Sequence, residues 1–257
     1  MNMPDRLNGW TMDMMTAMKA ALDTCAKDDA TKVVILTGAG RYYCAGVNLG
    51  ATLQLGHPQT LRTMIIEHNE GLFNNFLDFP KPIIAAVNGP AIGASVTSAT
   101  LCDALVASER ATFSTPFARL GLPAEGCSSV LFAKLLGDKD AERMLGKEGW
   151  QPTGQEAFDV GLANLCTPHD RLLDEAQHQA ERWVKEGRQR TFRGGMTHNE
   201  LEAVNKRESV QVADAFLDSP FLEAQYRFLR CKGKHSQALV FFALWRTRRL
   251  WSRLLTV

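Results

Sequence analysis

Apolar residues recur with two different spacings in the first part of the chain. Over residues 11–27 and 60–78 they return every three or four positions, which predicts two amphipathic helices. Residues 33–38 and 83–87 are short, nearly continuous apolar runs, a pattern typical of strands buried on both faces. Helices and strands therefore alternate, which indicates an α/β fold.

The C-terminal third of the chain is expected to be helical. Two further short strands are predicted before it, at residues 105–107 and 111–113. Helical patterns cover residues 128–136, 140–145, 154–160, 170–187 and 198–218. We therefore divide the chain into a core, residues 1–187, and a helical C-terminal region, residues 188–257, which packs on the core or on another subunit.

The end of the C-terminal region is basic. Residues 232–257 contain six Lys or Arg, no Asp or Glu, and several large aromatic side chains. A basic amphipathic helix of this kind suits a membrane surface or a docking partner. The more ordinary interpretation is a terminal helix that covers apolar surface in an oligomer.

Composition narrows the function classes. The chain has 257 residues, of which 45% are hydrophobic and 22% charged, with a formal net charge of +1, so no global field favours nucleic acid. The six cysteines form no CxxC pair and no close Cys/His cluster, which predicts neither a metal site nor a disulfide framework. No signal peptide is visible, and Gly and Pro interrupt the longest uncharged stretch, residues 82–102, so no membrane-spanning helix is expected.

Two turn segments rich in small residues each follow a predicted buried strand. They are residues 42–49 (YYCAGVNL) and 88–95 (NGPAIGAS). Small side chains let a ligand approach backbone N–H groups, and two such donors that converge on one carbonyl oxygen form an oxyanion hole. The alternative is a pair of tight turns selected for packing.

A third segment, residues 114–129, carries one acid, Glu125, among apolar and small residues just ahead of a predicted helix. A desolvated carboxyl there would have a raised pKa and could carry a proton. It is equally compatible with a first-turn glutamate favoured by the helix dipole. Common phosphate-binding, zinc-protease and serine-hydrolase motifs are absent from the sequence.

Taken in order, these segments resemble the crotonase (enoyl-CoA hydratase/isomerase) superfamily. The likeness extends over roughly residues 4–230 and is closest to delta-3,delta-2-enoyl-CoA isomerases of the peroxisomal type. It rests on IIAAVNGPAIG at 83–93, RATFSTPF at 110–117 and EGCSS at 125–129. The resemblance implies a spiral core of ββα turns and a helical C-terminal region that forms a homotrimer.

The resemblance also implies roles for individual residues. The backbone N–H groups of Val47 and Ala94 stand where the family has its oxyanion hole, and Glu125 stands where these isomerases have their catalytic glutamate. The residues expected to line the acyl-CoA pocket are Ala45, Gly46, Asn48, Leu49 and Gly93. Asn48 replaces an aspartate that is common at this position.

Two further positions bear on whether the chain resembles a hydratase or an isomerase of the superfamily. Hydratases of the superfamily carry glutamates at the positions that match Thr97 and Phe117. Without them, the resemblance implies an isomerase that converts 3-enoyl-CoA to 2-trans-enoyl-CoA through a thioester enolate, in the β-oxidation of unsaturated fatty acids. The acyl-CoA thioester is the substrate, and no metal or redox cofactor is expected. The alternatives are a non-catalytic acyl-CoA-binding module and another crotonase activity, either hydration or thioester hydrolysis.

The two ends of the chain differ from the pattern of this family. Relatives have one or more strands before the segment that matches Met3 and Pro4, so we expect a truncated or incomplete first turn of the spiral. Peroxisomal relatives end in a tripeptide of the Ser-Lys-Leu type, whereas Ser252-Arg253-Leu254 is followed here by three more residues. Kinship therefore favours the peroxisome, with the mitochondrion as the alternative, and no terminal targeting tripeptide is visible.

Overall fold

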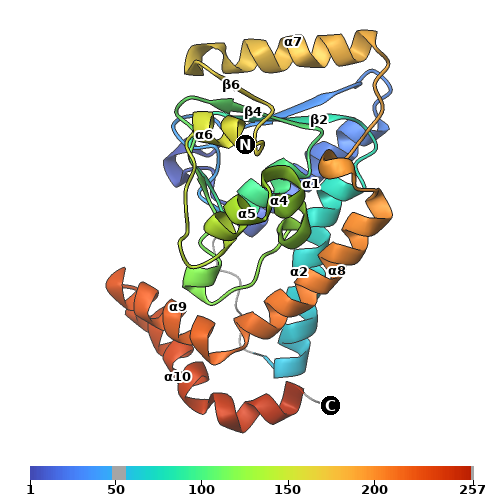
Figure 1. Cartoon of the computed structure of the whole chain (residues 1–257). Helices are drawn as coiled ribbons and strands as arrows, with labels where there is room; N and C mark the ends of the chain where they lie inside the picture. The colour runs from blue at the N-terminus through green and yellow to red at the C-terminus, as the bar shows by residue number, and fades with distance from the viewer. Residues whose placement is uncertain (48–55, 256–257) are drawn as a thin grey trace.

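The computed structural model describes residues 1–47 and 56–255 and alternates strands with helices along its first two thirds (Figure 1). The strands are β1 (Val34–Thr37), β2 (Ile83–Val87), β3 (Ala91–Ile92), β4 (Ala104–Ser108), β5 (Phe113–Ser114) and β6 (Leu165–Thr167). The helices are α1 (Met12–Lys27), α2 (Pro58–Leu77), α3 (Ala94–Thr100), α4 (Ser128–Leu136), α5 (Asp138–Leu145), α6 (Gly154–Asp159), α7 (Leu172–Lys185), α8 (His198–Phe216), α9 (Ser219–Cys231) and α10 (His235–Trp251). The predicted α/β class is confirmed.

The larger of the two sheets is parallel and has four strands in the order β1-β2-β4-β6. A smaller parallel pair, β3 and β5, continues from the ends of β2 and β4. The apolar run at residues 83–87 forms β2, one of the two inner strands, and is buried throughout as expected. The sequence analysis missed β6, a three-residue edge strand that begins at Leu165, because so short a segment shows no alternation.

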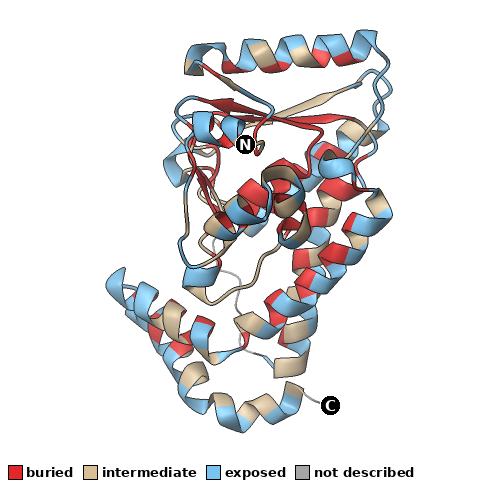
Figure 2. Cartoon of the chain, in the orientation of Figure 1, coloured by how far each residue is buried: buried red, intermediate tan, exposed pale blue. Residues whose placement is uncertain are grey.

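The two faces of the sheet pack against different helices. Side chains of Ile84 and Ala86 on β2 lie under α7, next to Trp183. Ile83 and Val87 point to the opposite face, into the main core that α1 and α4 complete. Figure 2 shows the resulting buried layers along the strands and on the inner faces of the helices. Burial on both faces explains why the strands are apolar throughout.

Helix caps fix several boundaries. The Thr11 side chain accepts a hydrogen bond from the Met14 N–H and starts α1. Thr153 and Glu156 form a capping box at the start of α6, and Thr197 and Glu200 form one at the start of α8. These polar pairs locate the helices in the sequence independently of the apolar pattern.

The C-terminal region is helical, and its first helix belongs to the wall of the core. Helix α8 lies along α2, while α9 and α10 form a hairpin that extends away from the sheet (Figure 1). Phe221, Leu222 and Leu229 of α9 pack with Phe241 of α10. Helix α9 was not singled out from the sequence. No helix in the described residues is long and apolar enough to cross a membrane.

Candidate active site

A cavity of about 800 Å³ lies at the carboxyl end of the sheet, where α/β folds place ligand sites. Its walls come from both turn segments, from α2, from residues 116–125 and from α8 and α9. Most of the lining is apolar: Met12, Leu61, Met64, Ile65, Leu72, Leu122, Val212, Phe216, Phe228 and Leu229. The volume and lining suit a largely apolar ligand with a few polar groups.

The first turn segment reaches the cavity because it is held against the second. The Ile92 N–H donates to the Cys44 carbonyl, at 3.1 Å. Gly46 follows with φ +84°, and a Cβ atom there would lie 2.9 Å from the Ile92 carbonyl oxygen. Only glycine therefore allows the two turns to approach this closely while Val47 faces the cavity.

The second turn segment presents the start of α3 to the same space. The Gly93 N–H donates to the Ser114 carbonyl at 2.8 Å, which fixes the turn against β5. Ala94 begins α3 and lines the cavity with Val47. Among residues 1–47 and 56–255, the N–H groups of Val47 and Ala94 donate to no protein acceptor. Two unpaired donors beside one cavity are the requirement for holding a ligand oxygen.

Glu125 lines the cavity from the loop ahead of α4. Its Oε2 accepts a hydrogen bond from Asn69 Nδ2 at 2.8 Å. Burial raises the pKa of Glu125 to about 7, and the like charge of Glu208 acts in the same direction, while the Asn69 hydrogen bond opposes both. The carboxyl is therefore poised to gain and lose a proton near neutral pH, while α2, through Asn69, holds it in place.

Glu125 is the only acidic side chain among the described residues that line this cavity. Phe117, at one of the two positions where hydratases carry glutamate, is 3% exposed and lines the wall. Thr97, at the other position, is buried in α3, where its hydroxyl donates to the Ala94 carbonyl at 3.2 Å. The described site thus has one carboxylate where a hydration site would have two.

The structure brings together the predicted residues Ala45, Gly46, Val47, Gly93, Ala94 and Glu125. Asn48 and Leu49, also predicted, lie outside the described residues. Sequence reasoning missed Asn69, although a buried asparagine on the apolar face of the helix predicted over residues 60–78 was a usable signal. It also missed Glu208 and Ser209 of α8, whose side chains lie behind the site.

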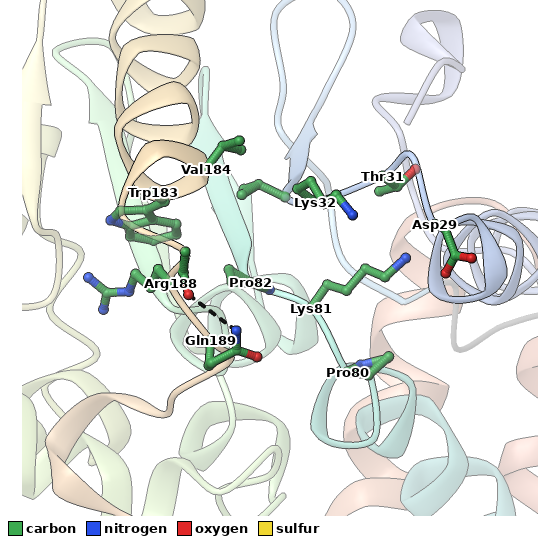
Figure 3. A pocket seen from close by; sticks show the side chains of 12 residues that line it. Asp29, Thr31, Lys32, Pro80, Lys81, Pro82, Trp183, Val184, Arg188 and Gln189 are labelled. Atoms are coloured by element: carbon green, nitrogen blue, oxygen red, sulfur yellow. Dashed lines mark hydrogen bonds between the residues drawn. The ribbon is translucent and has the colours of Figure 1, made fainter.

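A second hollow, of about 340 Å³, lies at the opposite end of the sheet between the starts of β1 and β2 and the end of α7 (Figure 3). The Lys81 ammonium there donates to the carbonyls of Cys25 and Asp28, at 2.7 Å each, and so caps α1. Arg188 stacks on Trp183 at 4.3 Å. These cations support neighbouring elements, so we place the reaction in the larger cavity. No cluster of metal-binding side chains occurs in the described part of the chain.

Comparison with known proteins agrees with this geometry. Residues 1–226 match the family described as Enoyl-CoA hydratase/isomerase. The chain is 35% identical over 240 residues to Enoyl-CoA delta isomerase 2 of Rattus norvegicus, covering 91% of this chain and 61% of that protein. Chromodomain Y-like protein of Rattus norvegicus is 37% identical over 159 residues, which cover 61% of this chain and 27% of that protein.

Solved structures show the same fold. An enoyl-CoA hydratase/isomerase from Pseudoalteromonas atlantica T6c superposes with a TM-score of 0.74 at 28% identity, covering 90% of this chain and 91% of that one. The expected crotonase fold is confirmed by this superposition and by the family match. The chain belongs to the enoyl-CoA hydratase/isomerase family.

Proposed function

We propose that the protein is a delta-3,delta-2-enoyl-CoA isomerase that moves the double bond of a 3-enoyl-CoA to the 2-trans position. The observation that carries the proposal is one carboxyl, with its pKa raised to about 7, in a cavity also lined by Val47 and Ala94, whose N–H groups donate to no acceptor among the described residues. Double-bond transposition needs a single group that can take up a proton and return it.

The chemistry follows from these groups. The Glu125 carboxylate removes a proton from C2, and the electron pair moves through C2 and C1 onto the thioester oxygen. The N–H groups of Val47 and Ala94 stabilise this enolate oxygen, each by roughly 3 kcal/mol if they resemble other oxyanion donors. Glu125 then delivers the proton to C4, the double bond settles between C2 and C3, and the carboxylate is restored. No metal or redox cofactor enters this sequence.

The same observations disfavour hydration. Adding water needs a carboxylate to activate the water while a second group handles the other proton. Phe117 and Thr97 offer neither carboxylate, and Phe117 makes its side of the described cavity apolar. A thioesterase would likewise need an activated water beside the carbonyl carbon.

Two relatives bear on whether the site is that of an isomerase or of a domain that only binds acyl-CoA. The rat relative is named Enoyl-CoA delta isomerase 2, and this chain spans 61% of its length. The name of Chromodomain Y-like protein states no enzyme activity, and we keep as a second candidate a domain that binds acyl-CoA without turnover. Glu125 argues against the second candidate, because pure binding does not require a desolvated carboxyl, which is costly to keep ionised.

The role in the cell is also a proposal. We place the reaction in the β-oxidation of unsaturated fatty acids. A relative at 35% identity, Enoyl-CoA delta isomerase 3 of Mus musculus, is named peroxisomal, which supports the peroxisome as the compartment. We further propose a homotrimer assembled through the C-terminal helices, which sedimentation of the purified protein would test.

The deciding experiment follows the conversion of 3-hexenoyl-CoA to 2-hexenoyl-CoA through the absorbance of the new conjugated thioester. We expect turnover by the native chain and its loss in Glu125→Gln, with CoA-ester binding retained. Saturable binding by the folded native chain without turnover would overturn the isomerase and favour the binding domain. Consumption of 2-hexenoyl-CoA to a hydroxyacyl product would instead identify a hydratase.

A further inference from the structure

Helix α8 places three polar side chains in its buried face, on which apolar residues are otherwise expected. The buried positions 201, 204, 205, 208, 209, 212 and 213 form one stripe along the helix, and Asn205, Glu208 and Ser209 belong to it. Asn205 Nδ2 bonds the Glu70 carbonyl and Asn74 Oδ1 on α2, which joins the two helices. The side chains of Glu208 and Ser209 bond to groups next to Glu125: the loop that follows it and the amide of Asn69.

Glu208 binds the backbone just after Glu125. Its Oε2 accepts from the Cys127 N–H at 2.6 Å and its Oε1 from the Ser129 N–H at 2.9 Å. Helix α4 starts at Ser128, has no side-chain cap of its own and has no acid in its first turn. Glu208 therefore caps α4 from another helix. Burial raises the pKa of Glu208, while its bonds to the Ser129 and Cys127 N–H groups beside the positive end of α4 favour the ionised form and oppose that shift.

This cap acts on a loop that is already constrained. Cys127 has φ +64°, a left-handed conformation that is uncommon for a side chain larger than glycine. A Cβ atom at the preceding residue, Gly126, would lie 2.5 Å from the Phe73 ring and 2.6 Å from the Thr97 hydroxyl. The two bonds from Glu208 hold the loop in this conformation, which directs Glu125 into the cavity.

Ser209 acts on the other end of Glu125. Its Oγ lies 2.9 Å from Asn69 Oδ1, so the hydroxyl donates to the amide oxygen. This bond orients the amide with Nδ2 toward Glu125 Oε2, at 2.8 Å. Both Ser209 and Asn69 are buried, so water competes little for the bond between them.

We propose that Glu208 and Ser209 are positioning residues for the base of the reaction: consecutive residues of α8 that hold Glu125 from two sides. Glu208 fixes the backbone and sets a like charge near the carboxyl, and Ser209 orients the amide that binds it. The inference rests on the proposed function in that it takes Glu125 as the base. It explains why a helix remote in sequence carries a buried acid that does not line the cavity.

The remaining charged and titratable groups around the pair do not repeat these roles. Burial lowers the pKa of His68, which favours its neutral form, and burial raises the pKa of the Cys127 thiol. The cations of the neighbourhood are exposed: Arg119 and Lys234 at the cavity and Arg207 on α8. Exposed charges act weakly through solvent, so Glu208 is the principal charged neighbour of Glu125.

The test measures the titration of Glu125 directly, by carbon NMR of the full-length protein labelled at glutamate side-chain carboxyls, with Glu125→Gln to assign the signal. In Glu208→Gln the like charge is lost, and the midpoint should move to lower pH by at least about half a unit. In Ser209→Ala the amide is no longer oriented, and the midpoint should move to higher pH. Val204→Ala, which trims the same buried face without touching a polar group, should lower the melting temperature and leave the midpoint in place.

The isomerisation assay then separates this inference from the proposed function. If the chain isomerises, the low-pH limb of its rate profile should follow each NMR midpoint. If the variants shift the Glu125 titration midpoint but the native chain shows no turnover, the isomerase proposal fails and the positioning roles of Glu208 and Ser209 still hold. Midpoints unchanged in Ser209→Ala and in folded Glu208→Gln would overturn the inference and make both residues structural. If Glu208→Gln does not fold, Ser209→Ala alone decides the outcome.

Discussion

Two acids of this protein, Asp103 and Glu125, have opposite surroundings. Asp103, at the start of β4, is saturated: its Oδ2 accepts from the Ile83 N–H and from Arg190 Nη1, at 2.8 and 2.6 Å, and its Oδ1 accepts from the Thr191 N–H at 2.7 Å. Among the described residues, the Glu125 carboxyl has one hydrogen-bond partner, the neutral Asn69, and it lines the cavity. Asp103 joins the core to the segment that leads to α8, whereas the Glu125 Oε1 atom accepts no hydrogen bond from the described residues.

The different partners of Asp103 and Glu125 show how to distinguish an acid that supports the fold from one that can exchange a proton. A guanidinium and several N–H groups occupy both oxygens of Asp103, which makes this acid part of the framework. A single amide offsets only part of the desolvation cost, so the proton is exchanged near neutral pH. Burial by itself does not separate the two cases, but the number and charge of the partners do.

The largest expected effect comes from neutralising Glu125. Glu125→Gln keeps the shape and removes the base, so kcat should fall by about 10²- to 10⁴-fold, the usual contribution of a general base. The measurement is the conjugated-thioester absorbance with 3-hexenoyl-CoA, with the circular dichroism spectrum as a check on folding. Retention of more than a tenth of the native rate would show that Glu125 is not the base.

The same change at Asp103 should act on stability instead. Asp103→Asn leaves the largely buried Arg190 without its counter-ion, and breaking a buried pair on one side costs about 3–5 kcal/mol. Urea unfolding followed by tryptophan fluorescence measures this loss. The matched control is Asp78→Asn, because the Asp78 and His198 side chains are 62% and 40% exposed and such pairs contribute at most about 1 kcal/mol. Equal losses of unfolding free energy in Asp103→Asn and Asp78→Asn would show that Asp103 has no special structural role.

Glu125 should also destabilise the folded chain at high pH. A folded pKa of about 7 against an unfolded value of 4.5 means that the folded state holds the proton more tightly, so stability falls as pH rises from about 4.5 to 7. The full difference corresponds to roughly 3 kcal/mol as an upper bound. Glu125→Gln should therefore raise the melting temperature at pH 8 and change it little at pH 4. An equal change at both values would show that the carboxyl is not desolvated.

The smallest expected effect belongs to the amide partner. Asn69→Ala removes the bond that favours the ionised carboxyl, so the low-pH limb of kcat/KM should move up by about one pH unit. The control is Asn74→Ala, on the same helix, whose amide oxygen bonds Asn205 away from the cavity. If the low-pH limb of kcat/KM does not move in Asn69→Ala, or moves equally in both variants, Asn69 does not tune the Glu125 carboxyl.

Much of the framework was predictable from local pattern. The strand at 83–87, the helix at 128–136 and the helical C-terminal region follow from apolar spacing, because side chains that face a core must repeat with the period of their element. The short edge strand β6 and helix α9 were missed. In β6 the contacts with β4 select the strand, since three residues carry too little pattern of their own.

The site was predictable in part, for a different reason. The segments around Val47, Ala94 and Glu125 are local, and their small residues and single acid stand out in the sequence. The place of Asn69 on the apolar face of its helix was a signal, but nothing near Asn69 in the sequence marks its bond to Glu125, 56 residues away. Nothing near Glu208 marks its bonds to the Cys127 and Ser129 N–H groups. Their involvement depends on how α2 and α8 pack.

The sequence by itself determined which residues are able to do chemistry: two glycine-containing turns that expose backbone N–H groups, and one glutamate in apolar surroundings. These properties are local, because turn conformation and hydropathy depend on neighbouring residues. The tertiary structure decided which acid is reactive. The pKa of a carboxyl depends on its desolvation and on the charges and donors around it, and here those come from α2 and α8, which only the folded chain brings together.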